Sequence, residues 1–209
     1  PDNEPYLGLK SLYWFDRIIV WALAGNQNVA LHTHINLSTL TDLQNAACQI
    51  IPQGINITLS IRELLRQAYL FPALVLIRPL IERAAVISYL SSNHEAVTLW
   101  KNGGKYNQRP KLAKMLHTMA VTKGVIGEAQ KICDAHNHIV HGDPIGSYYN
   151  LIKMNDGRIG YASGKILDNQ KLCDEIAMES QCYLIVLASQ MSIIFPDVTI
   201  PTMPDDTIE

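Results

Sequence analysis

The stretch from Ile61 to Leu90 constrains the fold most, because apolar residues surround almost the whole circumference of the helix that it predicts. A helix that is apolar on every side must be covered by neighbouring elements. Ser60 followed by Glu63 matches a capping box and predicts that this helix starts there. Pro72 and Pro79 each remove a backbone donor, so we expect a kinked or two-part helix at the centre of a bundle.

The rest of the chain predicts further helices and one pair of strands. Residues 26–57 are nearly uncharged and rich in Asn, Thr and Gln, which predicts loops around a single helix near 41–51. Asn155-Asp156-Gly157 between two β-rich runs predicts a hairpin. Other helices are expected over residues 8–25, 93–103, 110–124, 125–141 and 168–196. The predicted fold is therefore mainly α, a helical bundle with one inserted β-hairpin near 147–163.

The predicted elements form one helical domain over residues 1–195, followed by a mobile acidic tail over 196–209 that holds three prolines. Charged residues make up 17% of the chain and hydrophobic residues 48%. Soluble domains usually contain roughly 25% charged residues. This shortage of charge suggests extra buried surface, such as a homodimer interface.

Composition also narrows the classes of function. The formal net charge of −2 leaves no global basic field for nucleic acid. The four cysteines show no C-x-x-C spacing, so we expect buried free thiols in a reducing cytoplasm. Arg78, Glu82 and Arg83 interrupt the most membrane-like stretch, and no membrane span is predicted. No phosphate-binding loop, dinucleotide motif or zincin motif occurs, and no cofactor is expected.

One window of the chain is basic. No acidic residue lies between Glu95 and Glu128. The window is either a solvated helix face or a surface that contacts RNA phosphates. The candidate nucleic-acid-binding residues in it are Lys101, Lys105, Arg109, Lys111 and Lys114.

Three of the seven histidines lie close together where a predicted helix ends. Helical spacing places His138 and His141 on one polar face with Asn137. His136 falls on the apolar stripe instead, so we expect it to be a buried, hydrogen-bonded core residue. His141, beside a terminating glycine, is the first candidate for a catalytic residue. Its alternative role is to interact with the dipole at the helix C-terminus.

The cluster superficially resembles the H-x-H-x-D-H motif of metallo-β-lactamase-like hydrolases. In that family the motif follows a strand in a β-rich sandwich, whereas a helix precedes it here. This chain also has Val140 where that family has Asp. We therefore predict no metal site, and keep a metal-dependent hydrolase only as a third alternative.

Asn137-x-x-x-His141 at a helix end, in a small helical protein, resembles the R-[N/D/H]-x-x-x-H motif of HEPN-superfamily ribonucleases. The segments ALVLIRPLIERAAVISYL and HNHIVHGDP are together similar to a group of bacterial HEPN-like proteins. That group shares an R-x-x-x-E helix and a terminal V-H-G. The resemblance covers roughly residues 60–143.

The resemblance implies a helical bundle, usually dimeric, with the motif of each subunit facing its partner. It also implies metal-independent cleavage, in which the RNA 2′-hydroxyl attacks the adjacent phosphate. His141 would be the catalytic histidine and Asn137 the polar motif residue. His136 stands where the family has Arg, so Arg78 or Arg83 would have to stabilise charge on the phosphate.

Three functions follow from these patterns. The first is a metal-independent ribonuclease of a bacterial toxin or phage-defence system. The second is a non-catalytic interaction or sensing protein on the same scaffold, in which Arg78, Glu82 and His141 form a buried polar network. The third is the metal hydrolase. The candidate partners are a second copy of the chain, RNA and a partner or activator protein, and no membrane partner is expected.

Overall fold

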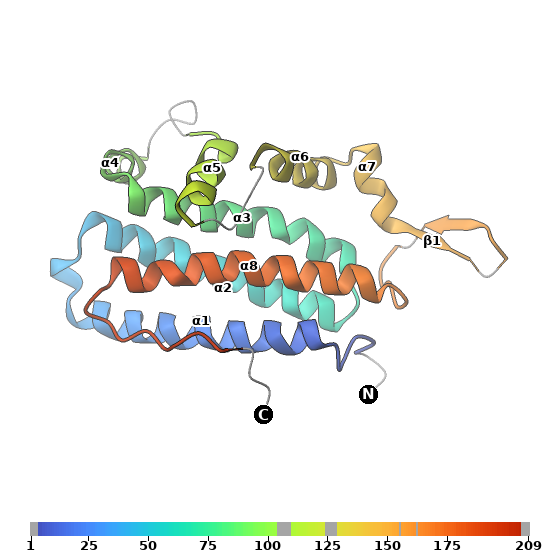
Figure 1. Cartoon of the computed structure of the whole chain (residues 1–209), viewed down its shortest axis with the longest axis horizontal. Helices are drawn as coiled ribbons and strands as arrows, with labels where there is room; N and C mark the ends of the chain where they lie inside the picture. Colours follow the sequence, from blue (N-terminus) through green and yellow to red (C-terminus); the bar gives the residue numbers. More distant parts are fainter. Residues whose placement is uncertain (1–3, 104–109, 124–128, 155, 162, 206–209) are drawn as a thin grey trace.

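Four long helices form the bundle at the centre of the computed structural model (Figure 1). Helices α2, α3 and α8 contact one another, and α1 packs against α2 and α8. The mainly helical fold with one small hairpin confirms the predicted fold class. The long helices are α1 (Lys10–Ile35), α2 (Asp42–Arg66), α3 (Leu70–Ser92) and α8 (Gln170–Ile194). The structure describes residues 4–103, 110–123, 129–154, 156–161 and 163–205.

A layer of short helices covers the outer side of α3 (Figure 1). Helix α3 contacts three of them, α4, α5 and α6, as well as α2 and α8 on its other side. Neighbours on both sides explain why this helix is apolar around its circumference. The short helices are α4 (His94–Lys101), α5 (Leu112–Lys123), α6 (Ala129–Val140) and α7 (Pro144–Ser147).

The predicted start of the central helix at Ser60 is wrong. Ser60 lies inside α2, and its hydroxyl donates to the carbonyl of Asn56 at 3.0 Å. The capping box is found at Thr41 instead, whose hydroxyl accepts from the backbone N–H of Gln44 while the Gln44 side chain accepts from the Thr41 N–H.

The central stretch is in two parts, as predicted, but neither Pro72 nor Pro79 divides it, because both lie within α3. The break falls before them, at residues 67–69. Ala68 adopts a left-handed conformation with φ of 65°. Its N–H donates to the Leu65 carbonyl at 3.0 Å, and the N–H of Tyr69 donates to the Leu64 carbonyl at 2.8 Å. This is a Schellman ending, in which Ala occupies the position usually held by Gly. The two parts are therefore the separate helices α2 and α3.

The loops predicted over 26–57 are mostly helical. Helix α1 continues to Ile35, and the short 3-10 helix Leu37–Thr39 leads into α2. Pro52 and Gly54 both lie inside α2. A Cβ at Gly54 would lie 2.7 Å from Cδ2 of Leu187, so the glycine permits the close approach of α8.

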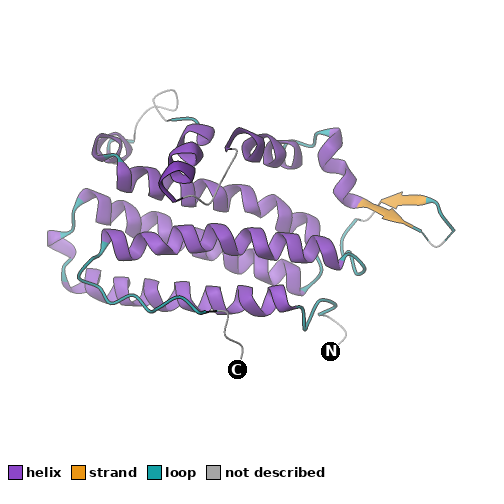
Figure 2. Ribbon diagram, in the orientation of Figure 1, coloured by secondary structure: helices purple, strands orange, loops and turns teal. Residues whose placement is uncertain are grey.

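The hairpin is shorter than predicted and projects from one end of the molecule (Figure 2). Strand β1 (Leu151–Lys153) pairs with β2 (Ile159–Tyr161) in antiparallel register, with Leu151 opposite Tyr161. Residues 147–150, expected in the first strand, lie in α7 and the 3-10 helix Tyr148–Asn150. Asn155 of the predicted turn lies outside the described residues.

The C-terminal segment lies along α1 (Figure 1). Trp21 Nε1 donates to the carbonyl of Pro201 at 2.8 Å, and Asn28 Nδ2 donates to the carbonyl of Thr199 at 2.8 Å. Val198 and Ile200 pack against the core. Residues 196–205 of the segment predicted to be mobile therefore have specific contacts, and residues 206–209 lie outside the described part of the chain.

Candidate functional site

The C-terminal half of α6 carries three of the predicted site residues, His136, Asn137 and His138, and His141 follows it directly. Two glycines shape this end of the helix. Gly142 has φ of +68° and follows the helix in a left-handed conformation. A Cβ at Gly146 would lie 2.5 Å from the carbonyl oxygen of His138. The chain therefore turns directly after α6 and folds α7 back against the helix that bears the histidines.

His136 is 5% exposed, which confirms the prediction that it faces the core. Its Nε2 lies 2.8 Å from Oε1 of Glu179 on α8. Its Nδ1 is buried and has no hydrogen-bond partner among the described residues. No pattern in the sequence indicated Glu179 as the partner, because the pairing depends on how α6 packs against α8.

Arg78 and Glu82 form the ion pair that their spacing predicts, with Nη1 of Arg78 3.2 Å from Oε1 of Glu82. The Arg78 side chain is 17% exposed. Its Nε also donates to Oδ1 of Asn137 at 3.4 Å, a long contact that connects α3 with α6. The guanidinium thus contacts the polar face of α6, which the sequence alone did not predict.

Glu82 is shared between two arginines. Its Oε2 lies 3.6 Å from Nη1 of Arg83, whose Nε donates to Oε1 of Gln53 at 3.0 Å. A continuous chain of polar contacts therefore runs from α2 through α3 to Asn137 on α6.

The two remaining histidines lie nearer the surface. His138 is partly exposed, and its Nδ1 lies 3.0 Å from Oδ2 of Asp143. His141 is exposed. The buried network proposed for Arg78, Glu82 and His141 is therefore wrong about His141, whereas Asn137 does contact Arg78.

The three histidines of the cluster do not converge. No group of three or more His, Cys, Asp or Glu side chains within the described ranges is placed to hold a metal ion. His136 pairs with Glu179 and His138 with Asp143, because residues two apart on a helix point to different sides. The spacing that resembles a metal motif thus has no matching geometry.

The basic window does not join the histidines into one site. Lys101 forms an ion pair with Asp42 at 2.8 Å. Lys111 and Lys114, at the start of α5, are exposed. Helices α4 and α6 lie at opposite ends of the outer layer, with α5 between them (Figure 1). Lys105 and Arg109 of the predicted surface lie outside the described residues.

All four cysteines are free thiols. The expectation that they are buried is met by Cys133 and Cys173, whereas Cys48 is partly buried and Cys182 is exposed. Burial raises the pKa of the Cys133 thiol, which lies on α6 one turn before Asn137.

The chain matches no protein-family model, no curated protein and no solved structure. Within the described residues, no helix combines the length and the apolar character needed to span a membrane.

Proposed function

We propose that this protein cleaves RNA without a metal ion, using the face of α6 that carries Asn137, His138 and His141. The observation that supports this most directly is the contact from Arg78 Nε to Asn137 Oδ1 at 3.4 Å. Asn137 lies in the last turn of α6, and His141 follows the helix directly, with its N–H donating to the Asn137 carbonyl at 2.9 Å, so the two residues lie on the same side of the helix end. A guanidinium from α3 thus takes the place near the motif where His136 replaces the family's arginine.

The two outer histidines suit the acid and the base of such a reaction. One imidazole removes the proton from the RNA 2′-hydroxyl, whose oxygen then bonds to the adjacent phosphorus. The bond from phosphorus to the 5′-oxygen breaks, and the second imidazole donates a proton to that leaving oxygen. We assign these roles to His141, which is exposed, and to His138, whose Nδ1 contact with Asp143 at 3.0 Å orients the ring.

Arg78 acts in this proposal as a positioning residue. Its guanidinium holds the side chain of Asn137 and adds positive charge beside the phosphate, while Glu82 fixes the guanidinium from the other side at 3.2 Å. Lys111 and Lys114 are exposed at the start of α5, outside the histidine site, and in this proposal they bind a separate part of the RNA backbone.

The proposed setting is a homodimer in the cytoplasm of a bacterium, acting as a toxin or in phage defence, with a partner or activator protein that raises a basal activity. The resemblance to HEPN-like proteins and the low charged content of 17% support this setting. Light scattering on the purified protein tests the dimer, and a monomeric mass would contradict it.

The experiment is cleavage of a mixed-sequence RNA by the wild type, His141→Ala and His117→Ala, each with and without EDTA. His117 is exposed on α5 and provides a matched control. We expect cleavage that survives EDTA, yields a 2′,3′-cyclic phosphate end, and falls by about 10²–10⁴-fold only in His141→Ala. Wild-type activity in His141→Ala, loss of activity in EDTA, or no cleavage by the wild type would each contradict the proposal.

A non-catalytic sensing protein is the second candidate. The observation that favours it is an apolar pocket of about 360 Å³ on the side of α3 that faces α4 and α5. A wild-type protein that binds a small molecule there and cleaves no RNA would support this alternative.

A further inference from the structure

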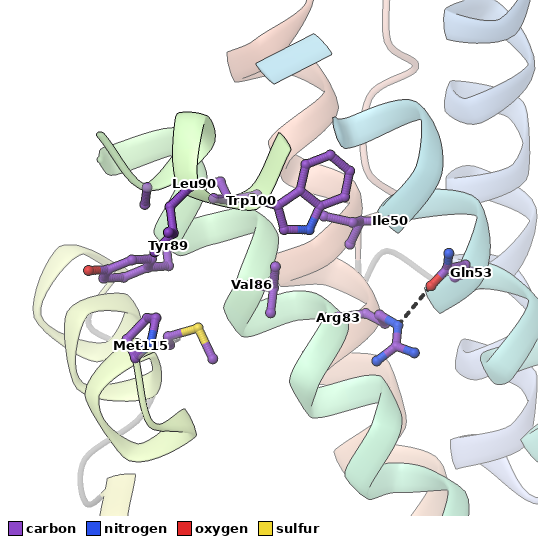
Figure 3. Close-up of a pocket in the computed structure, with 11 residues that line it drawn as sticks. Ile50, Gln53, Arg83, Val86, Tyr89, Leu90, Trp100 and Met115 are labelled. Atoms are coloured by element: carbon purple, nitrogen blue, oxygen red, sulfur yellow. Dashed lines mark hydrogen bonds between the residues drawn. The ribbon is translucent and has the colours of Figure 1, made fainter. Parts of the chain in front are cut away.

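A pocket opens between helices α2, α3, α4 and the start of α5 (Figure 3). Its volume of about 360 Å³ falls within the range of small-molecule sites, roughly 300–1,000 Å³. None of the histidines of the candidate site lines it. The lining residues that carry the argument are Ile50, Gln53, Arg83, Tyr89, Trp100 and Met115.

Most of the pocket wall is apolar. Figure 3 shows Trp100 beside Ile50 on one side of the pocket, and Tyr89 with Met115 on another. Val86 of α3 lies between these two groups. Aromatic and thioether side chains provide flat, adaptable contacts for an apolar ligand.

The polar end of the pocket carries hydrogen-bond donors. Arg83 is the one charged residue among the described residues that line it. Its Nε donates to Oε1 of Gln53 at 3.0 Å, so the Gln53 amide directs its acceptor to Arg83 and keeps both N–H groups as donors. Neither Nε2 of Gln53 nor Nη2 of Arg83 contacts an acceptor within the described part of the chain. A ligand that meets this end must therefore supply acceptors.

The charge at this end is balanced only in part. Nη1 of Arg83 lies 3.6 Å from Oε2 of Glu82, whose other oxygen pairs with Arg78 at 3.2 Å. Because Glu82 is shared with Arg78 and its contact with Arg83 is long, the charge of Arg83 is only partly compensated. A single planar guanidinium beside one amide matches the two oxygens of a carboxylate.

We propose that this pocket binds a small apolar carboxylic acid. The carboxylate lies against Arg83 and Gln53, and the apolar body lies between Trp100, Tyr89 and Met115. This site is separate from the proposed RNA-cleaving face, so its test does not depend on whether the protein cleaves RNA.

The test is calorimetric titration with 2-naphthoic acid and, as the uncharged match, 2-naphthamide. We expect the wild type to bind the acid about tenfold more tightly than the amide, because a charge-assisted hydrogen bond is stronger than a neutral one. Arg83→Gln should bring the two affinities within about twofold. Val86→Trp, which fills the pocket, should abolish binding of both compounds.

Arg17→Gln is the matched control, because Arg17 stacks over Trp14 on α1 and does not line the pocket. It should keep the wild-type preference for the acid, and thermal melting confirms that each variant is folded. A preference that persists in Arg83→Gln, equal binding of acid and amide by the wild type, or no saturable binding up to the solubility limit of the acid would overturn the proposal.

Discussion

His136 on α6 and Glu179 on α8 are paired, with Nε2 and Oε1 2.8 Å apart. Since the His136 side chain is 6% exposed, removing it leaves a cavity and an unpaired carboxylate. We expect His136→Ala to lower the free energy of unfolding by about 1–3 kcal/mol. Glu179→Gln should cost less, because an amide can still hydrogen-bond the ring. Urea denaturation measures both.

The exposed His117 provides the control for this pair, and His117→Ala should leave stability within about 0.5 kcal/mol of the wild type. The single variant Glu179→Ala and the double variant His136→Ala/Glu179→Ala complete, with His136→Ala, a mutant cycle that isolates the pairwise energy. A coupling energy of zero would show that the two side chains do not stabilise the packing of α6 on α8.

The local spacing of apolar residues predicted that His136 faces the core, but it could not predict which residue His136 contacts there. Helical spacing relative to apolar neighbours directs the ring inward, and it is buried. Glu179 lies 43 residues further along the chain. Its pairing with His136 depends on the angle and register at which two helices pack, which periodicity does not contain. The contact between Arg78 and Asn137 was missed for the same reason, whereas Arg78 and Glu82, on one helix, were paired correctly.

The positions of the helix ends were also only partly predictable from the sequence. The break at Ala68 was not located because a Schellman ending usually carries Gly, and Ala gives no such signal. Pro52 and Gly54 suggested loops, yet both lie within α2. There the packing of α2 against α3 and α8 outweighs the local cost of proline, about 3 kcal/mol in a helix interior.

Gly54 and Gly25 offer a matched test of helix packing. A Cβ at Gly54 would lie 2.7 Å from Cδ2 of Leu187, a branched and fully buried side chain. A Cβ at Gly25 would lie 2.7 Å from Cε of Met191, the flexible end of an unbranched side chain. We expect Gly54→Ala to destabilise the protein by about 1–3 kcal/mol.

Gly25→Ala should remain within about 1 kcal/mol of the wild type, because the gain in helix propensity offsets the movement of Met191. Chemical denaturation of the wild type and both variants measures the free energies of unfolding to be compared. Equal losses at the two positions would contradict the distinction between a rigid and a flexible neighbour.

The contacts of residues 196–205 with α1 predict that the C-terminal segment stabilises the bundle. Deleting residues 198–209 removes the packing of Val198 and Ile200 and the carbonyl that accepts from Trp21 Nε1. We expect a loss of about 1–3 kcal/mol and a red shift in tryptophan fluorescence, as Trp21 becomes solvated.

Deleting only residues 206–209 leaves these contacts in place and serves as the control. It should match the wild type in both stability and emission. If the longer deletion behaves like the shorter one, the segment does not contribute to stability.

Cys173 predicts a loss of stability at high pH. Burial raises the pKa of its thiol to about 12, and the carboxylate of Asp174 adds to the shift. In the unfolded chain the thiol has a pKa of about 8.5. Between pH 8.5 and pH 12, roughly, the folded protein therefore retains a proton that the unfolded chain releases. The contribution of Cys173 to the free energy of unfolding is therefore fully present below about pH 8.5, and it declines as the pH rises toward 12.

Urea unfolding at pH 7 and pH 10 of the wild type and Cys173→Ala measures this decline. Because Tyr183, whose pKa burial also raises, is present in both proteins, its contribution cancels in the comparison. The wild type should lose about 1–2 kcal/mol more than the variant between the two pH values. Alkylation gives an independent readout, since the native Cys173 thiol should react far more slowly at pH 8 than an ordinary thiol. Identical pH dependence in the two proteins would contradict a folded-state thiol that stays neutral at pH 10.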